Sequence, residues 1–303
     1  MDWQDTLIRL YFFVCDEFNS GLSLYNQRFM KNASTFELKF SDEEAVTLYV
    51  FGHLQGHKEV LPIHKYCRNH LMDWFPNLPS YPKFNERLNR LNDLLAHFVT
   101  QLCHRFIIAQ YLFLGERLDG VLDSMPIIMA RGSRADSAKV AVEVADKGLC
   151  STKKLWYHGL KLHLLCICNP GTLPVPLQII ATEASAHDNT TFKEELAPDL
   201  PCFRVFADRA CHDEGAAPDL MKAYNVQVCP VLKRQKGQKE LFFDQKLQNY
   251  AVSTMRQPIE AFFNWLEVHS GIQVASKVRS TSGLYKHLWG KVATALIGAL
   301  LFF

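Results

Sequence analysis

The sequence predicts an α/β fold in which a mixed sheet with flanking helices follows an all-α N-terminal domain. The chain has 303 residues, enough for two domains, and its 48% hydrophobic and 21% charged residues are typical of a folded globular protein. The spacing of the apolar residues changes near residue 115, from a helical period to short β-like runs. We therefore expect a helical domain over residues 1–115 and an α/β domain over residues 116–303.

Helical spacing of apolar residues runs through the N-terminal part of the chain. It is clearest in "LIRLYFFVCDEF", "DEEAVTLYVFGHL" and "FNERLNRLNDLLAHFVTQLCHRF". Ser41, followed three residues later by Glu44, predicts a capping box at the start of the second of these helices.

The C-terminal part of the chain reads as strands and helices in alternation. Five strands are predicted by "GVLDSMPII", "LWYHGLKLHLLCIC", "LPVPLQIIAT", "FRVFAD" and "VQVCPVL". Helices are predicted by "TTFKEELAPDL", "EGAAPDLMKAY" and "STMRQPIEAFFNWLEVHS". The resulting order, β, β, β, α, β, α, β, α, indicates hairpin-joined strands followed by helical crossovers.

The cysteines and the two ends of the chain bear on its location. The nine cysteines lie mostly inside apolar runs without the spacing of a disulfide framework, which predicts reduced thiols in a cytoplasmic protein. The N-terminus lacks the basic leader of a signal peptide. The apolar C-terminal segment "LWGKVATALIGALLFF" is short and contains Lys291, so we expect a buried closing helix and no membrane partner.

The formal net charge of +2 conceals a basic region near the C-terminus. Residues 228–291 contain ten Lys or Arg residues and four Asp or Glu residues. A polyanionic partner would explain this excess, and a solvated lysine-rich face would explain it equally well.

Three acidic residues stand out by their positions on the predicted elements. Asp123 lies inside the first strand, Asp208 ends the fourth strand, and Glu260 lies on the late helix. A buried carboxylate is costly unless it is paired or binds a metal ion. Acids from three elements could converge to hold two divalent cations about 3.5–4 Å apart, an arrangement suited to phosphoryl chemistry.

The segments around these acids, "VLDSMPI", "VFADRAC" and "RQPIEAFF", resemble the DDE transposases of bacterial insertion sequences. The nearest resemblance is to the insertion-sequence family nine-eight-two, and "FPNLPSYPKFNERLNRL" and "GLCSTKKLWYHGLKLHLL" extend it over nearly the whole chain. It implies a ribonuclease-H-like catalytic domain preceded by a helical domain that binds DNA ends. It also implies that Asp123, Asp208 and Glu260 are the catalytic acids and bind two Mg²⁺ or Mn²⁺ ions.

The function implied by this resemblance is DNA transposition. Such an enzyme cleaves the ends of a mobile element and joins them to target DNA by in-line displacement, and a homodimer is expected on the DNA ends. The partners would be double-stranded DNA carrying the terminal inverted repeats and the target DNA. In the α/β domain the expected DNA contacts are Lys153, Lys154, Lys161, Arg256, Lys233 and Arg234. In the helical domain they are Lys83, Arg87, Arg90 and Arg105.

The helix of the third acid departs from the family pattern of Tyr, Arg, Glu and Lys. Arg256 and Glu260 match it, whereas Ser253 stands at the Tyr position and Glu267 at the Lys position. Glu267 is therefore a rival third ligand, and we favour Glu260 because Arg256 is placed one turn before it to hold it.

Two further positions near the predicted site leave alternatives open. Pro258 predicts a helix that either begins near Thr254 or is kinked. Asp188, in "ASAHDNT", could lie near the metals, contact DNA or cap the helix that follows.

Other functions remain compatible with the sequence. One is a catalytically inactive, transposase-derived DNA-binding protein, and another is a metal-dependent nuclease without strand transfer. His53, His57, His64, Cys67 and His70 have partly zinc-like spacing but match no closed zinc motif, so we favour helix-surface and core histidines. Ser124 has no histidine near it in the sequence, so a hydrolase nucleophile is not predicted.

Overall fold

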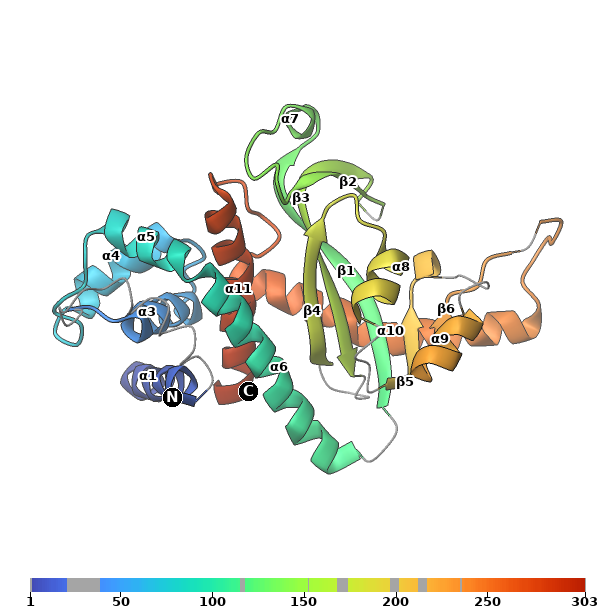
Figure 1. Cartoon of the computed structure of the whole chain (residues 1–303), viewed down its shortest axis with the longest axis horizontal. Helices are drawn as coiled ribbons and strands as arrows, with labels where there is room; N and C mark the ends of the chain where they lie inside the picture. Colours follow the sequence, from blue (N-terminus) through green and yellow to red (C-terminus); the bar gives the residue numbers. More distant parts are fainter. Residues whose placement is uncertain are drawn as a thin grey trace. The chain divides into compact units, whose positions relative to one another are not determined.

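The computed structural model describes residues 2–20, 39–114, 118–151, 153–167, 174–196, 202–211, 217–234 and 236–302. The chain is α/β, with an N-terminal helical region and a mixed sheet, as the sequence predicts (Figure 1). It divides into two compact units. The helical unit comprises Met1–Leu102 and Leu266–Phe303, and the α/β unit comprises Cys103–Trp265.

The helical unit is built from helices at both ends of the chain. They are α1 (Trp3–Ser20), α3 (Asp42–Leu54), α4 (Val60–His70), α5 (Tyr81–Arg90), the start of α6 (Asn92–Leu114), the end of α10 (Phe243–Ser270) and α11 (Thr281–Phe302). In α3 every residue from Ala45 to His53 is buried, which is typical of a helix surrounded by others. The predicted capping box at its start is confirmed. The Ser41 Oγ accepts from the Glu44 N–H at 3.1 Å, and the Ser41 N–H donates to the Glu44 Oε2 at 2.6 Å.

The C-terminal helix α11 packs against α3 and α5. Its buried residues Leu284, Leu288 and Val292 recur every fourth position, so they form one apolar stripe. Gly290 permits the close approach to α3, because a Cβ there would lie 2.7 Å from the Tyr49 ring. The predicted buried closing helix is confirmed, but it belongs to the helical unit, whereas the sequence division at residue 116 placed it with the sheet. No helix in the described ranges is long and apolar enough to cross a membrane.

In its described residues the α/β unit contains six strands and the helices that join them. The strands are β1 (Leu118–Arg131), β2 (Asp146–Cys150), β3 (Leu155–Ile167), β4 (Val175–Glu183), β5 (Cys202–Ala207) and β6 (Gln227–Pro230). The shorter helical elements are α7 (Ser133–Asp136), α8 (Asp188–Thr191), η1 (Phe192–Leu196), η3 (Arg209–Cys211) and α9 (Ala217–Tyr224). The five predicted strands are confirmed, and β2 is an addition because "DKGLC" lacks an apolar alternation.

The strands form one mixed sheet in the order β2-β3-β1-β5-β6, and β4 also pairs with β3. The first strands are antiparallel neighbours, whereas β5 runs parallel to β1 and β6 parallel to β5. β2 and β4 occupy successive lengths of the same edge of β3. At the β1 bulge a Cβ on Gly159 would lie only 1.9 Å from the Ile127 carbonyl oxygen, so that position of β3 requires glycine.

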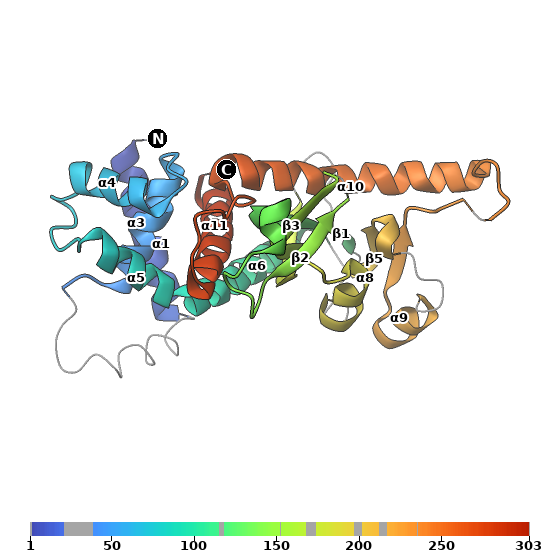
Figure 2. The same ribbon diagram turned by 90° about the horizontal axis from the view of Figure 1, so that it is seen from above.

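Helices cover both faces of the sheet, as Figures 1 and 2 show together. One face carries Leu122, Leu165 and Val205, which pack with Phe192 of η1 and Leu220 of α9. The other face lies against α10 (Figure 2). This helix begins at Phe243 and contains Pro258 in its interior, so of the two predicted alternatives the start near Thr254 is wrong.

Candidate active site

Asp123 lies within β1, and Asp208 directly follows β5, the parallel neighbour of β1. β1 and β5 pair Asp119 with Arg204 and Val121 with Phe206. The same register, continued by two residues, places Asp123 opposite Asp208 and on the same face of the sheet. The carboxylate that directly follows β5 thus lies near the carboxylate inside β1, where it acts on the pKa of Asp123.

An ion pair at the other end of this strand pair supports the register. Arg204 donates from Nε to Asp119 Oδ1 at 2.9 Å and from Nη2 to Asp119 Oδ2 at 2.6 Å. Two parallel bonds of this kind fix a guanidinium and a carboxylate in one geometry. The pair therefore stabilises the alignment that places the two aspartates together.

Arg256 of α10 reaches both aspartates. Its Nη2 donates to the Asp123 Oδ2 at 2.8 Å, and its Nη1 lies 3.6 Å from the Asp208 Oδ1. The Arg256 side chain is only 13% exposed, and its Nε is buried without a hydrogen-bond partner in the described part of the chain. The Arg256 guanidinium therefore lies between two carboxylates, and its Nε–H makes no hydrogen bond to the described residues.

The two carboxylates occupy different environments. Asp123 is largely buried, with 20% of its side chain exposed, whereas Asp208 is 57% exposed. The pKa of Asp123 is raised to about 6, chiefly by burial and in smaller part by the neighbouring Asp208. Arg256 and the Ser124 N–H, which donates to Asp123 Oδ1 at 2.8 Å, both act to lower that pKa. Asp123 thus binds its proton more tightly than an ordinary aspartate. A further positive charge near it would stabilise its ionised form.

Glu260 lies on α10 one turn after Arg256, so the two residues share a face of the helix. Its side chain is exposed. Its rival, Glu267, belongs to the helical unit, where its Oε2 accepts from the Gln273 N–H at 2.7 Å. Glu267 thus has a structural role at the C-terminal end of α10.

Asp188 belongs to a second polar cluster on the other face of β1. Its Oδ1 accepts from Ser124 Oγ at 3.1 Å and lies 3.4 Å from both Lys161 Nζ and His163 Nδ1. Side chains alternate along a strand, so Ser124 points to the face opposite Asp123. His163 is buried, and burial lowers its pKa to about 4.

The pairing of Ser124 with His163 was not visible in the sequence, because the two residues are opposite each other only in the β1–β3 register. Ser124 donates its hydroxyl hydrogen to Asp188, while His163 Nε2 bonds to Thr182 Oγ1 at 2.9 Å. The serine is therefore not bonded to a histidine that could accept its proton.

The basic residues predicted to contact DNA differ in their surroundings. Lys153, Lys154 and Lys233 are exposed, and exposed Arg234 donates to the Lys239 carbonyl oxygen at 3.0 Å. Lys161 is only 17% exposed and donates to the Ala186 carbonyl oxygen at 2.6 Å, so it is committed to the Asp188 cluster.

The side chains of Lys83 and Arg90 in the helical unit are exposed, and so is that of Arg105, which lies on α6 within the α/β unit. Arg90 pairs with Glu86 on the same helix. Arg87 donates to the Phe40 carbonyl oxygen and lies 3.5 Å from the Asp42 carboxylate, so it stabilises the fold.

Within the described ranges, no three His, Cys, Asp or Glu side chains are close enough to hold a metal ion together. The histidines with zinc-like spacing make other contacts. His64 Nε2 lies 2.8 Å from the Pro79 carbonyl oxygen, and the rings of His57 and His70 pack on Tyr66. These contacts agree with the interpretation of helix-surface and core histidines.

Comparisons of the chain with protein-family models, with curated proteins and with solved structures find no match.

Proposed function

We propose that the chain is a divalent-metal-dependent enzyme that cleaves and joins DNA, with a ribonuclease-H-like catalytic domain. One observation carries the proposal: Arg256 lies between Asp123 of β1 and Asp208, which directly follows the adjacent parallel strand β5. Carboxylates from separate elements, gathered at one sheet position, are what phosphoryl transfer with two metal ions requires.

The order of the elements supports the same proposal. Antiparallel strands come first, and parallel strands joined by helices follow, with the first aspartate on β1, the second directly after β5 and the glutamate on the late helix α10. The resemblance to DDE transposases implies these positions for the three catalytic acids. Asp123, Asp208 and Glu260 are therefore the proposed acids.

The donor chemistry of the site fits Mg²⁺ or Mn²⁺, which prefer carboxylate oxygens. Arg256 supplies one positive charge to two carboxylates, so the ionised cluster retains an attraction for a further cation. Two such ions, when bound, would supply a polarised phosphate and an activated water. In the proposed reaction Asp123 and Asp208 would hold the ions together with Glu260.

Arg256 and the exposed basic residues would position the DNA. The guanidinium of Arg256 would attract a phosphate bound beside the two aspartates. Lys153, Lys154, Lys233 and Arg234 are exposed, as phosphate contacts must be, and the affinity they supply should fall as salt rises. Lys161 and Asp188 would stabilise β1 from its opposite face.

The experiment uses a DNA fragment that carries the chain's own gene with both flanks, incubated with the full chain and Mg²⁺ or Mn²⁺. We expect strand cleavage at the element ends and a joined product with target DNA, both abolished by EDTA. Cleavage without a joined product would favour a nuclease. Binding without cleavage would favour an inactive DNA-binding protein, and the absence of cleavage with either metal would contradict the proposal.

A further inference from the structure

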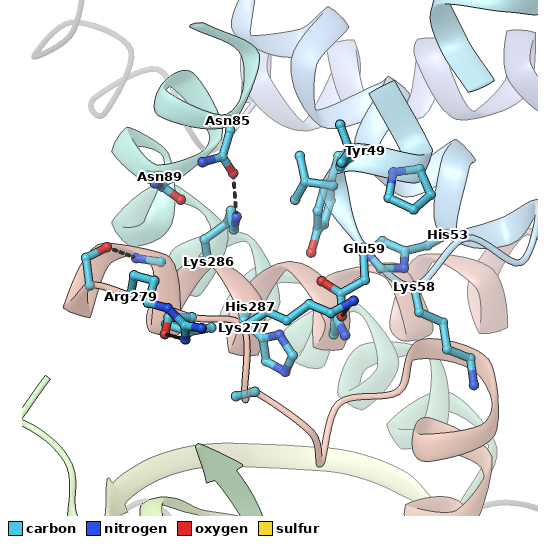
Figure 3. A pocket seen from close by; sticks show the side chains of 18 of the residues that line it. Tyr49, His53, Lys58, Glu59, Asn85, Asn89, Lys277, Arg279, Lys286 and His287 are labelled. Carbon is cyan, nitrogen blue, oxygen red and sulfur yellow. Dashed lines mark hydrogen bonds and ion pairs between the residues drawn. The ribbon is translucent and has the colours of Figure 1, made fainter. Parts of the chain in front are cut away.

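The helical unit contains a pocket of about 590 Å³ that none of the proposed DNA chemistry uses. Residues of α3, α4, α5 and α11 line it, together with the segments that precede α4 and α11 (Figure 3). All of these residues belong to the helical unit. The volume is in the range of small-molecule sites.

The lining of this pocket is strongly cationic. Its charged side chains are Lys58, Glu59, Lys277, Arg279, Lys286 and Lys291. The single carboxylate, Glu59, lies 3.9 Å from the Nζ of exposed Lys277. Five cations thus face one anion, and the balance favours an anionic occupant.

Two of these lysines are buried and bonded to neutral oxygens. Lys286 Nζ donates to the Asn85 Oδ1 at 2.9 Å, and Lys291 Nζ donates to the Gly271 carbonyl oxygen at 3.1 Å. Lys286 is 9% exposed and Lys291 2% exposed. Burial lowers the pKa of each to about 8. Burying an ammonium without a carboxylate partner is costly, and an anion bound beside the two lysines would offset that cost.

Polar atoms without partners line the same pocket. His53 is 3% exposed, and neither of its ring nitrogens has a hydrogen-bond partner among the described residues. The Asn89 Oδ1 is also buried and has no hydrogen-bond partner among the described residues. Buried polar atoms are normally satisfied, so these atoms mark places for ligand groups. An amide oxygen accepts hydrogen bonds, so the ligand must offer donors as well as negative charge.

We propose that this pocket binds a small phosphorylated ligand that carries hydroxyl groups. Lys286 and Lys291 would hold the phosphate, with Arg279 at the exposed side of the pocket, and Asn89 and His53 would bond to hydroxyl groups. A phosphate presents several acceptor oxygens and up to two negative charges, which matches two neighbouring ammonium groups. The proposal does not depend on DNA cleavage by the α/β unit.

The test is calorimetric titration of the full chain with ribose 5-phosphate and, separately, with ribose. We expect one saturable site for ribose 5-phosphate and no binding of ribose. Lys286→Gln and Arg279→Gln should each weaken binding about tenfold or more, because each removes a charge-assisted contact. Lys65→Gln, which changes an exposed lysine outside the pocket, should leave the affinity unchanged.

Three results would overturn the proposal. The first is no binding of ribose 5-phosphate by the native chain. The second is equal affinity in the native chain and in Arg279→Gln, a variant that leaves the core intact even if Lys286→Gln does not fold. The third is binding of a 5′-phosphorylated oligonucleotide in this pocket without binding of ribose 5-phosphate.

Discussion

Arg256 donates through Nη2 to the Asp123 Oδ2 at 2.8 Å, although the two residues lie on elements far apart in the sequence. The same guanidinium lies 3.6 Å from Asp208. It therefore lowers the mutual repulsion of two neighbouring carboxylates before any metal or DNA is present.

Replacing Arg256 with glutamine should destabilise the fold, because it leaves the mostly buried Asp123 carboxylate without its cation. Breaking such a pair from one side costs about 3 kcal/mol. The control is Arg204→Gln, which breaks an ion pair whose arginine is 47% exposed and should cost about 1 kcal/mol or less. Urea unfolding of both variants provides the comparison, and equal losses would contradict the special role of Arg256.

Glu260→Gln should abolish DNA cleavage while Glu267→Gln preserves it. Glu267 accepts from the Gln273 N–H, and a glutamine at that position can still accept. Glu260 is exposed one turn from Arg256, so its carboxylate is available to a metal ion. Cleavage assays on the two variants decide between them. If Glu267→Gln were inactive and Glu260→Gln active, Glu267 would be the third metal-binding acid in place of Glu260.

Much of the α/β fold could be predicted from the sequence, because each strand is a short apolar run that is clearly separated from the next one. The five strands, the helices between them and the positions of Asp123 and Asp208 all follow from local pattern. The sequence placed Arg256 one turn before Glu260 on the same helix face, but its contact with both aspartates depends on how α10 packs on the sheet. The start of α10 at Phe243 was missed because Pro258 dominates the local signal.

The pocket of the helical unit could not be predicted for a different reason. Lys286 and Lys291 look like solvent-facing lysines in the sequence, and their burial arises from the packing of α11 against α3 and α5. Likewise, the cluster of Ser124, His163 and Asp188 exists only through strand pairing and the position of α8. Contacts between residues distant in the chain carry no local signature.

Asp188→Asn should reduce stability and spare cleavage. The substitution removes the carboxylate that lies 3.4 Å from both Lys161 and His163, on the face of β1 opposite Asp123. We expect a loss of about 1–3 kcal/mol in unfolding free energy, since the amide can still accept a hydrogen bond but no longer carries the negative charge that Lys161 faces. Activity measured below the unfolding transition should stay within about tenfold. Loss of cleavage with unchanged stability would instead assign Asp188 to the reaction.

The buried lysines predict that stability rises with pH. Their pKa of about 8 in the folded chain lies below the ordinary 10.5, so between these values the unfolded chain binds more protons. The free energy of unfolding should therefore increase by roughly 1–2 kcal/mol per lysine as the pH rises from about 8 to 10. Substituting both lysines with methionine should remove that increase. Urea unfolding at the two pH values tests this, and the same rise in the variant would contradict it.

The most direct test of the proposed active site is the rate of metal-dependent cleavage by Asp208→Asn. The Asp208 side chain is 57% exposed, so folding and DNA binding should survive the change to an amide of the same shape. Removing one of the proposed metal ligands should lower the cleavage rate at least about 100-fold, since even residues that only support metal ligands contribute about 10–100-fold. A folded, DNA-binding Asp208→Asn variant that cleaves as fast as the native chain would contradict the account.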